Sequence, residues 1–253
     1  MKLQTNQYLR NLNRVEFIIT YACTGRCKHC SQGDHSADGN VIDAAAAVKA
    51  LREAAENYSI KSIMTFGGEP LIYADRAYPI HRAATELDIP KRQLITNGFF
   101  SRDEEYIRKV AKDLGECGVN DLLLSVDSFH EEHIPMSYVK LFAKALIENK
   151  VSTRLSPAWL VSCEDDNHYN RRTRELLYDF EAMGLPVGEG NVVFPKGNAL
   201  KYLGDYIDPD MKDPYEDDPT DVRSISIEPD NTLMGKSILT EEITDILSAY
   251  RPI

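Results

Sequence analysis

The sequence contains no apolar run that approaches the length of a membrane span, and residues 1–14 are polar, without the hydrophobic core of a signal peptide. We therefore expect no membrane partner. Only five cysteines are present, an odd number with three of them clustered, which is unlike a disulfide framework. This cysteine usage predicts a reducing compartment, the cytoplasm.

The sequence also lacks a block of basic residues. Its net charge is −11, from 29 Lys and Arg against 40 Asp and Glu. Because nucleic-acid affinity rests largely on neutralising phosphates, this balance argues against a DNA or RNA partner. Acidity by itself indicates no particular partner, since it is common in proteins that simply stay soluble.

Short apolar runs alternate with longer amphipathic ones along the 253 residues, which are enough for one large domain with a sizeable core. The runs predict strands over residues 15–20, 61–66, 92–96, 121–126, 151–156 and 191–194. The amphipathic stretches predict helices over residues 41–57, 74–87, 102–117 (with Ser101 as N-cap), 137–149 and 168–183. This alternation is typical of βαβ units and a parallel sheet. Six units are fewer than the eight of a closed barrel, so we predict an α/β fold, a partial (β/α)6 TIM-like barrel with a short C-terminal extension.

Three cysteines, Cys23, Cys27 and Cys30, lie in the loop that follows the first predicted strand. Soft sulfur ligands favour an iron–sulfur cluster, zinc or Cu(I). A structural zinc site needs four protein ligands, and Cys117 and Cys163 are too isolated to form a second pair. A cubane cluster normally takes four thiolates, so three local ones leave one iron open to an exogenous ligand.

The spacing C-x3-C-x2-C after a first strand resembles the signature of the radical S-adenosylmethionine (radical SAM) superfamily. The resemblance implies that the three cysteines bind one [4Fe-4S] cluster and that SAM chelates its fourth iron. It further implies reductive cleavage of SAM to a 5′-deoxyadenosyl radical, which abstracts a hydrogen atom from a substrate, and a reductant such as flavodoxin or ferredoxin. His29 stands where the family usually has an aromatic residue near the adenine.

The second predicted strand ends in Gly67-Gly68-Glu69-Pro70. Two glycines let a ligand approach the backbone, and Glu69 offers a carboxylate to an ammonium group, although a plain strand-to-helix turn is the alternative. About forty residues after the cysteines, the segment resembles the family's GGEP motif, which receives the SAM amino group. Asn97, in Thr-Asn-Gly at the end of the third strand, resembles a further SAM-binding position, although a lone Asn-Gly is usually a turn.

The fourth and fifth strands supply three more candidates. Ser125 and Asp127 resemble the family's Ser-x-Asp segment, in which the serine often reaches SAM. Asp127 either points toward the substrate, as a catalytic residue, or caps the following loop. Arg154 lies between apolar neighbours, where an arginine needs an anion; the SAM carboxylate and an acid on a neighbouring strand are the two alternatives. The His130/His133 pair is weak as a zinc site, with a substrate contact as the alternative.

We predict a boundary near residue 200, with a radical SAM barrel over 1–200 and an acidic loop plus a short cap over 201–253. Residues 205–221 are rich in Asp, Glu and Pro, which indicates a solvated loop or a lid. A strand and turn near 223–231 and a helix over 240–250 resemble a SPASM or twitch extension. Met234 and Gly235 stand where an auxiliary-cluster cysteine is expected, so we predict a single cluster.

The resemblance implies cleavage of SAM but does not identify the substrate or the hydrogen atom abstracted, because function is set by the site and not by the fold. The SPASM-like tail favours a peptide or peptide-derived substrate, as in natural-product tailoring, with another small molecule as the wider class. A glycyl-radical-enzyme activase is the second candidate, although residues 14–17 lack the Gly-rich strand typical of those proteins. A non-catalytic iron–sulfur binding or electron-transfer protein is the third, and it leaves the motifs at the strand ends unexplained.

Overall fold

The computed structural model describes residues 6–33 and 39–252. Within this part of the chain, six parallel strands form the main sheet, in the spatial order β5-β4-β3-β2-β1-β8. They are β1 (Arg14–Ile18), β2 (Ser62–Phe66), β3 (Lys91–Thr96), β4 (Asp121–Leu124), β5 (Thr153–Leu155) and β8 (Ser224–Ile227). This confirms the predicted α/β partial barrel.

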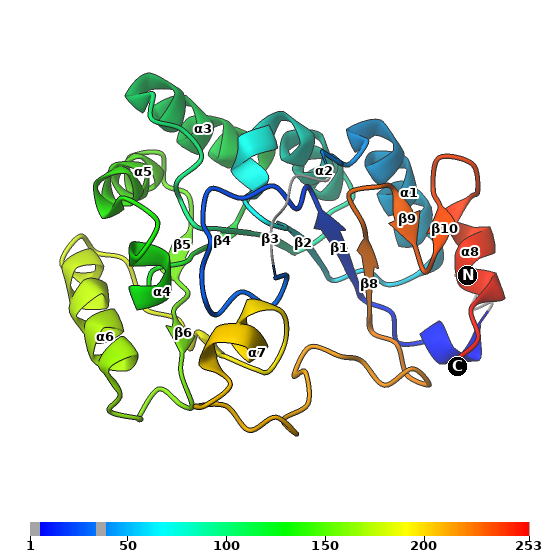
Figure 1. Ribbon diagram of the computed structural model, residues 1–253. Coiled ribbons are helices and arrows are strands. Elements are labelled where there is room, and N and C mark those ends of the chain that lie inside the picture. Colours follow the sequence, from blue (N-terminus) through cyan, green and yellow to red (C-terminus); the bar gives the residue numbers. More distant parts are fainter. Residues whose placement is uncertain (1–5, 34–38, 253) are drawn as a thin grey trace.

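Five longer helices form an arc around the outer side of the sheet (Figure 1). They are α1 (Ala44–Asn57), α2 (Ala74–Glu86), α3 (Glu104–Cys117), α5 (Met136–Glu148) and α6 (His168–Glu181). Each buries one apolar stripe, as Ile107, Val110 and Leu114 do on α3. Shorter helices complete the described chain: η1 (Gln7–Leu9), η2 (Pro70–Tyr73), α4 (Ser128–Glu131), α7 (Asn198–Leu203) and α8 (Ile243–Ala249).

Helix α3 begins two residues later than predicted. Its N-cap is Asp103, whose side chain accepts hydrogen bonds from the backbone N–H groups of Glu105 and Tyr106. Ser101, the predicted cap, instead accepts a bond from the backbone N–H of Asp103. The helix ends at Cys117, as the sequence predicted, and its C-cap Gly118 has a left-handed conformation (φ 96°).

The sixth strand of the sheet is a correction to the sequence prediction. Residues 191–194 were expected to supply it, but β7 (Asn191–Val192) pairs with β6 (Ala158–Trp159) outside the main sheet. Strand β8 instead pairs with β1, with Arg14 opposite Ser224. Its alternation explains the fit, since Ile225 and Ile227 are buried while Ser224 and Ser226 lie on the opposite face of the strand. The proposed boundary near residue 200 stays a prediction, but the chain beyond it contributes to the same sheet.

The C-terminal segment packs back onto the N-terminal one. The hairpin of β9 (Thr232–Leu233) and β10 (Lys236–Ser237) follows β8, and the side-chain amide of Asn6 donates to the carbonyls of Leu247 and Tyr250. The two ends of the described chain therefore lie side by side (Figure 1). In the part of the chain that the structure describes, no helix combines the length and apolarity needed to cross a bilayer.

Candidate functional site

A cavity of about 1300 Å³ opens on the concave side of the sheet. Its wall includes all three clustered cysteines and most of the residues predicted at the strand ends, namely Cys23, Cys27, His29, Cys30, Gly67, Gly68, Asn97, Ser125, Asp127 and Arg154. The predicted candidates therefore converge, as expected for the carboxyl ends of parallel strands. Glu69 is the exception, since it does not line the cavity.

The two glycines of the GGEP turn allow a close approach of two backbones. A Cβ on Gly67 would lie 2.3 Å from the carbonyl oxygen of Thr20, and one on Gly68 would lie 2.3 Å from that of Ala22. The turn donates hydrogen bonds to the same carbonyls, from Gly68 N to Thr20 (2.8 Å) and from Glu69 N to Ala22 (2.8 Å). The glycines thus hold the cysteine loop at the cavity wall. The sequence analysis had assigned them to the close approach of a ligand and did not predict this contact within the chain.

Helix α7, which the sequence did not predict, holds the other end of the cysteine loop. The backbone N–H of Asn198 donates to the carbonyl of Cys30 (2.9 Å), and its side-chain amide donates to that of Cys27 (3.2 Å). Asn198 is 5% exposed. A small apolar cluster packs around Cys27 and against α7, and it contains Cys27, Phe129, Leu160, Val193 and Leu203. Neither the Asn198 contacts nor this cluster could be predicted from a local sequence pattern, because both join segments about 170 residues apart.

Replacing Asn198 with alanine is expected to loosen this loop. The substitution removes the bond to Cys27 and leaves its carbonyl without that donor, at a cost of about 1 kcal/mol. After anaerobic reconstitution, iron should leave the variant roughly five times faster in the presence of a chelator. Asn57→Ala, which removes a similar amide–carbonyl bond within α1, is the matched control. Equal rates in both variants would contradict a role for Asn198.

The three thiols fit a thiolate-bound cluster. Burial raises the pKa of Cys23 to about 12 and also raises the pKa values of Cys27 and Cys30, so the buried groups are held as thiols in the absence of a cation. Iron would supply the positive charge that stabilises three thiolates. The Sγ of Cys23 already accepts bonds from Gly25 N (3.3 Å) and the amide of Asn97 (3.6 Å), donors that suit a thiolate.

Glu69 lies behind the cavity wall. Its side chain has no exposed surface, and its carboxylate accepts from Leu71 N (3.0 Å), Thr96 Oγ1 (2.7 Å) and Asn97 N (2.8 Å). Burial raises its pKa to about 7, against the opposing effect of these donors. The direct contact with an ammonium group that the sequence predicted is therefore not seen. Glu69 instead joins the end of β2 to the end of β3, where it orients Asn97.

Asp127 shows the capping alternative that the sequence left open. It has no exposed surface, and its carboxylate accepts from His130 N (2.9 Å), His130 Nδ1 (2.9 Å) and Ala158 N (3.1 Å). Burial alone would raise its pKa, but the His130 imidazole outweighs that effect and holds the pKa of Asp127 below its usual range. The carboxylate thus holds the His130 ring in place, and the predicted catalytic contact of Asp127 with a substrate stays a prediction.

His130, which the sequence analysis offered only as part of a weak zinc pair or as a substrate contact, lies at the cavity. Its side chain is 13% exposed at the cavity, and its ring lies 4.9 Å from that of His29. One donor atom from each of Cys27, His29 and His130 lies within 4.8 Å of the others. His29 also packs against Phe129 (5.0 Å), and its Nδ1 is buried without a hydrogen-bond partner among the described residues. The Asp-x-x-His spacing at the start of α4 was the signal available in the sequence.

Arg154 shows the neighbouring-strand alternative. Its guanidinium pairs with Asp121 on β4 (2.8 Å), part of a polar network across the cavity floor. In this network Gln93 donates to Asp121 (2.7 Å) and accepts from Arg14 (2.6 Å), which also pairs with Glu16 (2.6 Å). The guanidinium of Arg154 already has an acidic partner, Asp121. Its contact with the SAM carboxylate, the other alternative, stays a prediction. Ser125 keeps its predicted place, with its hydroxyl at the cavity.

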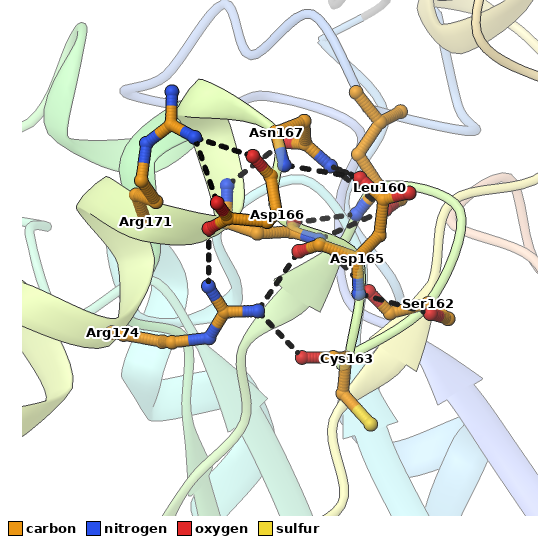
Figure 2. A network of polar contacts seen from close by, with 9 residues as sticks. Leu160, Ser162, Cys163, Asp165, Asp166, Asn167, Arg171 and Arg174 are labelled. Carbon is orange, nitrogen blue, oxygen red and sulfur yellow. Dashed lines mark hydrogen bonds and ion pairs between the residues drawn. The ribbon is translucent and has the colours of Figure 1, made fainter.

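The loop between β6 and α6 begins with Leu160, which belongs to the same apolar cluster as Cys27, and the loop is fixed by polar contacts (Figure 2). Asn170, on α6, is fully buried and makes four hydrogen bonds to the backbone, one accepted from Leu160 N and three donated to the carbonyls of Leu160, Ser162 and Asp165. Arg174 adds bonds to the Cys163 and Asp165 carbonyls. This network explains how a loop without regular structure keeps one shape.

Asn170→Leu is expected to destabilise the protein by about 3 kcal/mol, because it removes four hydrogen bonds made by a fully buried side chain and leaves Leu160 N without its acceptor. The free energy of unfolding in urea measures this effect. Arg171→Ala is the control in the same network, since it removes only exposed contacts with Asp166, an ion pair and a bond to the carbonyl, and should cost less than about 1 kcal/mol. Similar losses in the two variants would show that the buried amide has no special role.

A partial α/β barrel with three convergent thiols at one cavity and a glycine-rich turn beside them is the arrangement of a class of iron–sulfur enzymes. Residues 17–152 match the family model described as the Radical SAM superfamily. The chain belongs to the Radical SAM superfamily, whose cofactors are a [4Fe-4S] cluster and SAM.

Similar proteins agree with this assignment. A probable GTP 3′,8-cyclase of Saccharolobus islandicus is 25% identical over 218 residues, which cover 80% of this chain and 67% of that protein. SuiB of Streptococcus suis, solved with bound S-adenosylmethionine, has a TM-score of 0.60 at 15% identity and covers 95% of this chain and 66% of its own. anSMEcpe, solved with AdoMet and a peptide, has a TM-score of 0.57 at 13% identity, with 92% and 78% covered. The chain spans about two thirds of the first two proteins.

Proposed function

We propose that the protein cleaves SAM reductively at a single [4Fe-4S] cluster and abstracts a hydrogen atom from a peptide or peptide-derived substrate. The observation that carries the proposal is the convergence of Cys23, Cys27 and Cys30 with the GGEP turn, Asn97 and Ser125 on one cavity. A non-catalytic electron-transfer protein has no need of a cavity of about 1300 Å³ beside its cluster.

The three cysteines are the residues we assign to the cluster. The chemistry that a bound cluster and SAM supply is one-electron cleavage of SAM to methionine and a 5′-deoxyadenosyl radical. The chain's own part is to hold the cysteine loop between the GGEP turn and α7, and to donate hydrogen bonds from Gly25 N and Asn97 to the Sγ of Cys23. Such donors tune a metal site by stabilising the charge on its ligand.

We assign the SAM side of the cavity to four residues. The backbone of Gly67 and Gly68 and the hydroxyl of Ser125 face the cavity and offer polar groups to an amino acid moiety. His29 offers a ring face near Phe129 for an adenine. Glu69 supports this side from behind, and His130, fixed by Asp127, presents its ring between the cysteine loop and the rest of the cavity.

A peptide fits the remaining cavity better than a nucleotide does. The relatives named GTP 3′,8-cyclase raise GTP as an alternative substrate. A triphosphate needs cationic partners, and the lysine and arginine side chains that line the cavity are Arg14, Arg154 and Lys196. Each of the three is already paired, with Glu16, Asp121 and Asp213 respectively. A peptide-bound structure of similar fold, that of anSMEcpe, supports the peptide class.

An anaerobic assay tests the proposal. The protein is reconstituted with iron and sulfide, reduced with dithionite and incubated with SAM, and 5′-deoxyadenosine is quantified by chromatography. We expect about four irons per chain and 5′-deoxyadenosine without added substrate, with more in the presence of a mixed peptide library. Stimulation by GTP and not by peptides would favour the cyclase alternative. A complete cluster that never cleaves SAM would favour the electron-transfer alternative.

A further inference from the structure

A groove of about 430 Å³ lies beside the main cavity. It runs between the segment that follows β7 and the acidic segment after α7, two stretches joined by the ion pair of Lys196 and Asp213 (2.9 Å). Phe194, Lys196, Asp213, Tyr215 and Glu216 line both the groove and the cavity. The groove is therefore continuous with the cavity, and an extended molecule bound in the groove would reach into the candidate site.

The floor of the groove is apolar and exposed. Phe194, Pro195, Met211 and Tyr215 line it, and Tyr215 is 60% and Met211 40% exposed. The ring of Phe194 contacts that of Tyr215 at 5.8 Å, and the hydroxyl of Tyr215 is hydrogen-bonded to Asn191. These contacts fix the two rings against each other, and we call the pair the Phe194–Tyr215 platform. Aromatic platforms of this kind are enriched at sites of protein recognition.

The charge around the groove is negative. Residues 198–221 contain eight acidic side chains against two lysines, a net charge of −6. Glu216, on the rim, has no ion-pair partner in the described part of the chain, and neither do Asp217, Glu189 and Glu228, which line the adjoining cavity. The one lysine of the groove, Lys196, is already paired. An occupant with positive charge therefore gains attraction that no ion pair among the described residues supplies.

We propose that this groove binds a basic segment of the peptide substrate, with an apolar side chain on the Phe194–Tyr215 platform and a lysine or arginine beside Glu216. The inference rests on the proposed function, since it specifies the class of peptide that enters the cavity. Continuity with the cavity favours an extended peptide segment, because the same chain must pass from the groove to the radical site. Charge complementarity selects a cationic one.

Binding of defined probes tests the groove directly. The probe is a short fluorescein-labelled peptide that repeats lysine, leucine and serine, and its counterpart replaces every lysine with glutamate. Fluorescence anisotropy measures the dissociation constant for the full-length protein after reconstitution. Two variants alter the groove: Tyr215→Ser, which removes the platform, and Glu216→Gln, which removes the rim charge. Each has a matched control outside the groove lining, Tyr202→Ser on α7 and Asp210→Asn in the acidic segment.

We expect the basic probe to bind and the acidic one not to bind. Tyr215→Ser should raise the dissociation constant about tenfold, as truncation of a central aromatic contact does, and Glu216→Gln should raise it roughly threefold and reduce its salt dependence. The two controls should change it less than twofold. Equal effects in the groove and control variants would reduce the binding to general charge attraction and overturn the inference.

The remaining outcomes also decide the matter. No binding of the basic probe, or equal binding of the acidic one, overturns the inference. The proposed function is judged separately, by formation of 5′-deoxyadenosine in the unmodified protein without any peptide. If that protein cleaves SAM and the groove variants bind the probe normally, the enzyme assignment stands and the groove assignment fails. If the unmodified protein binds the probe through the groove but never cleaves SAM, the result supports the docking surface and contradicts the proposed radical chemistry.

Discussion

Replacing Cys27 with alanine is expected to abolish cluster assembly and, with it, all cleavage of SAM. Cys27 is the most buried of the three clustered cysteines, at 6% exposure, and its loop is fixed on both sides by backbone contacts. No neighbouring cysteine can move into its place, because Cys117 is buried in the main apolar core and Cys163 is exposed on the loop beyond β6. A cubane cluster cannot keep three protein-bound irons with two thiolates.

Iron content after reconstitution is the primary measurement, and it should fall from about four per chain to near zero. The visible absorption of the cluster and 5′-deoxyadenosine formation should disappear with it. Cys163→Ala is the control, since it removes an exposed thiol and should leave iron and activity unchanged. A complete, stable cluster in Cys27→Ala, or its loss in Cys163→Ala, would refute the assignment of the three ligands.

Replacing Glu69 with alanine is expected to cost about 4 kcal/mol of the free energy of unfolding. The substitution leaves three buried donors without their acceptor, Leu71 N, Thr96 Oγ1 and Asn97 N. Because Asn97 is released, SAM affinity should fall as well, although the carboxylate does not line the cavity. Urea unfolding of the cluster-free chain measures the first effect. Glu86→Ala, which removes only an exposed ion pair with Arg52, should cost less than about 1 kcal/mol.

The contribution of Glu69 to stability should also depend on pH. Burial raises its pKa from an ordinary value of 4.5 to about 7, so the folded chain binds this proton more tightly than the unfolded chain does. The contribution is therefore fully present below pH 4.5, declines as the pH rises through 7, and is constant above that. The separation of the two pKa values corresponds to about 3 kcal/mol.

Glu69→Gln isolates this effect, because the amide cannot ionise but still offers one oxygen to the same donors. The difference in unfolding free energy between the unmodified chain and this variant should shift against the unmodified chain between pH 4.5 and 7. A difference that stays constant over this range would mean that Glu69 is ionised in the folded protein as easily as in the unfolded one.

The parts of the site that could be predicted from the sequence are those whose meaning is local. Cys23, Cys27 and Cys30 lie within eight residues, and Gly67-Gly68-Glu69-Pro70 is a single turn, so spacing alone brings their chemistry together. The strand–helix alternation likewise predicted a parallel sheet, since each βαβ unit forms from adjacent residues. Where the sequence left two alternatives for Arg154, the partner Asp121 lay on another strand and no local pattern could identify it. At Asp127 the partner His130 lies three residues further on, so the Asp-x-x-His spacing was a local signal that the sequence analysis did not use.

The sequence by itself determined the class of this protein: the iron–sulfur motif, the GGEP turn and the partial barrel follow from short segments with strong local preferences. Only the tertiary structure decided that β8 and not residues 191–194 completes the sheet, that Asn198 holds the cysteine loop, and that the Glu69 carboxylate accepts a hydrogen bond from Asn97 N. The physical reason is the same in each case. These contacts join residues far apart in the chain, and the entropy lost in bringing them together is repaid by burial and hydrogen bonding that exist only once the whole sheet has formed.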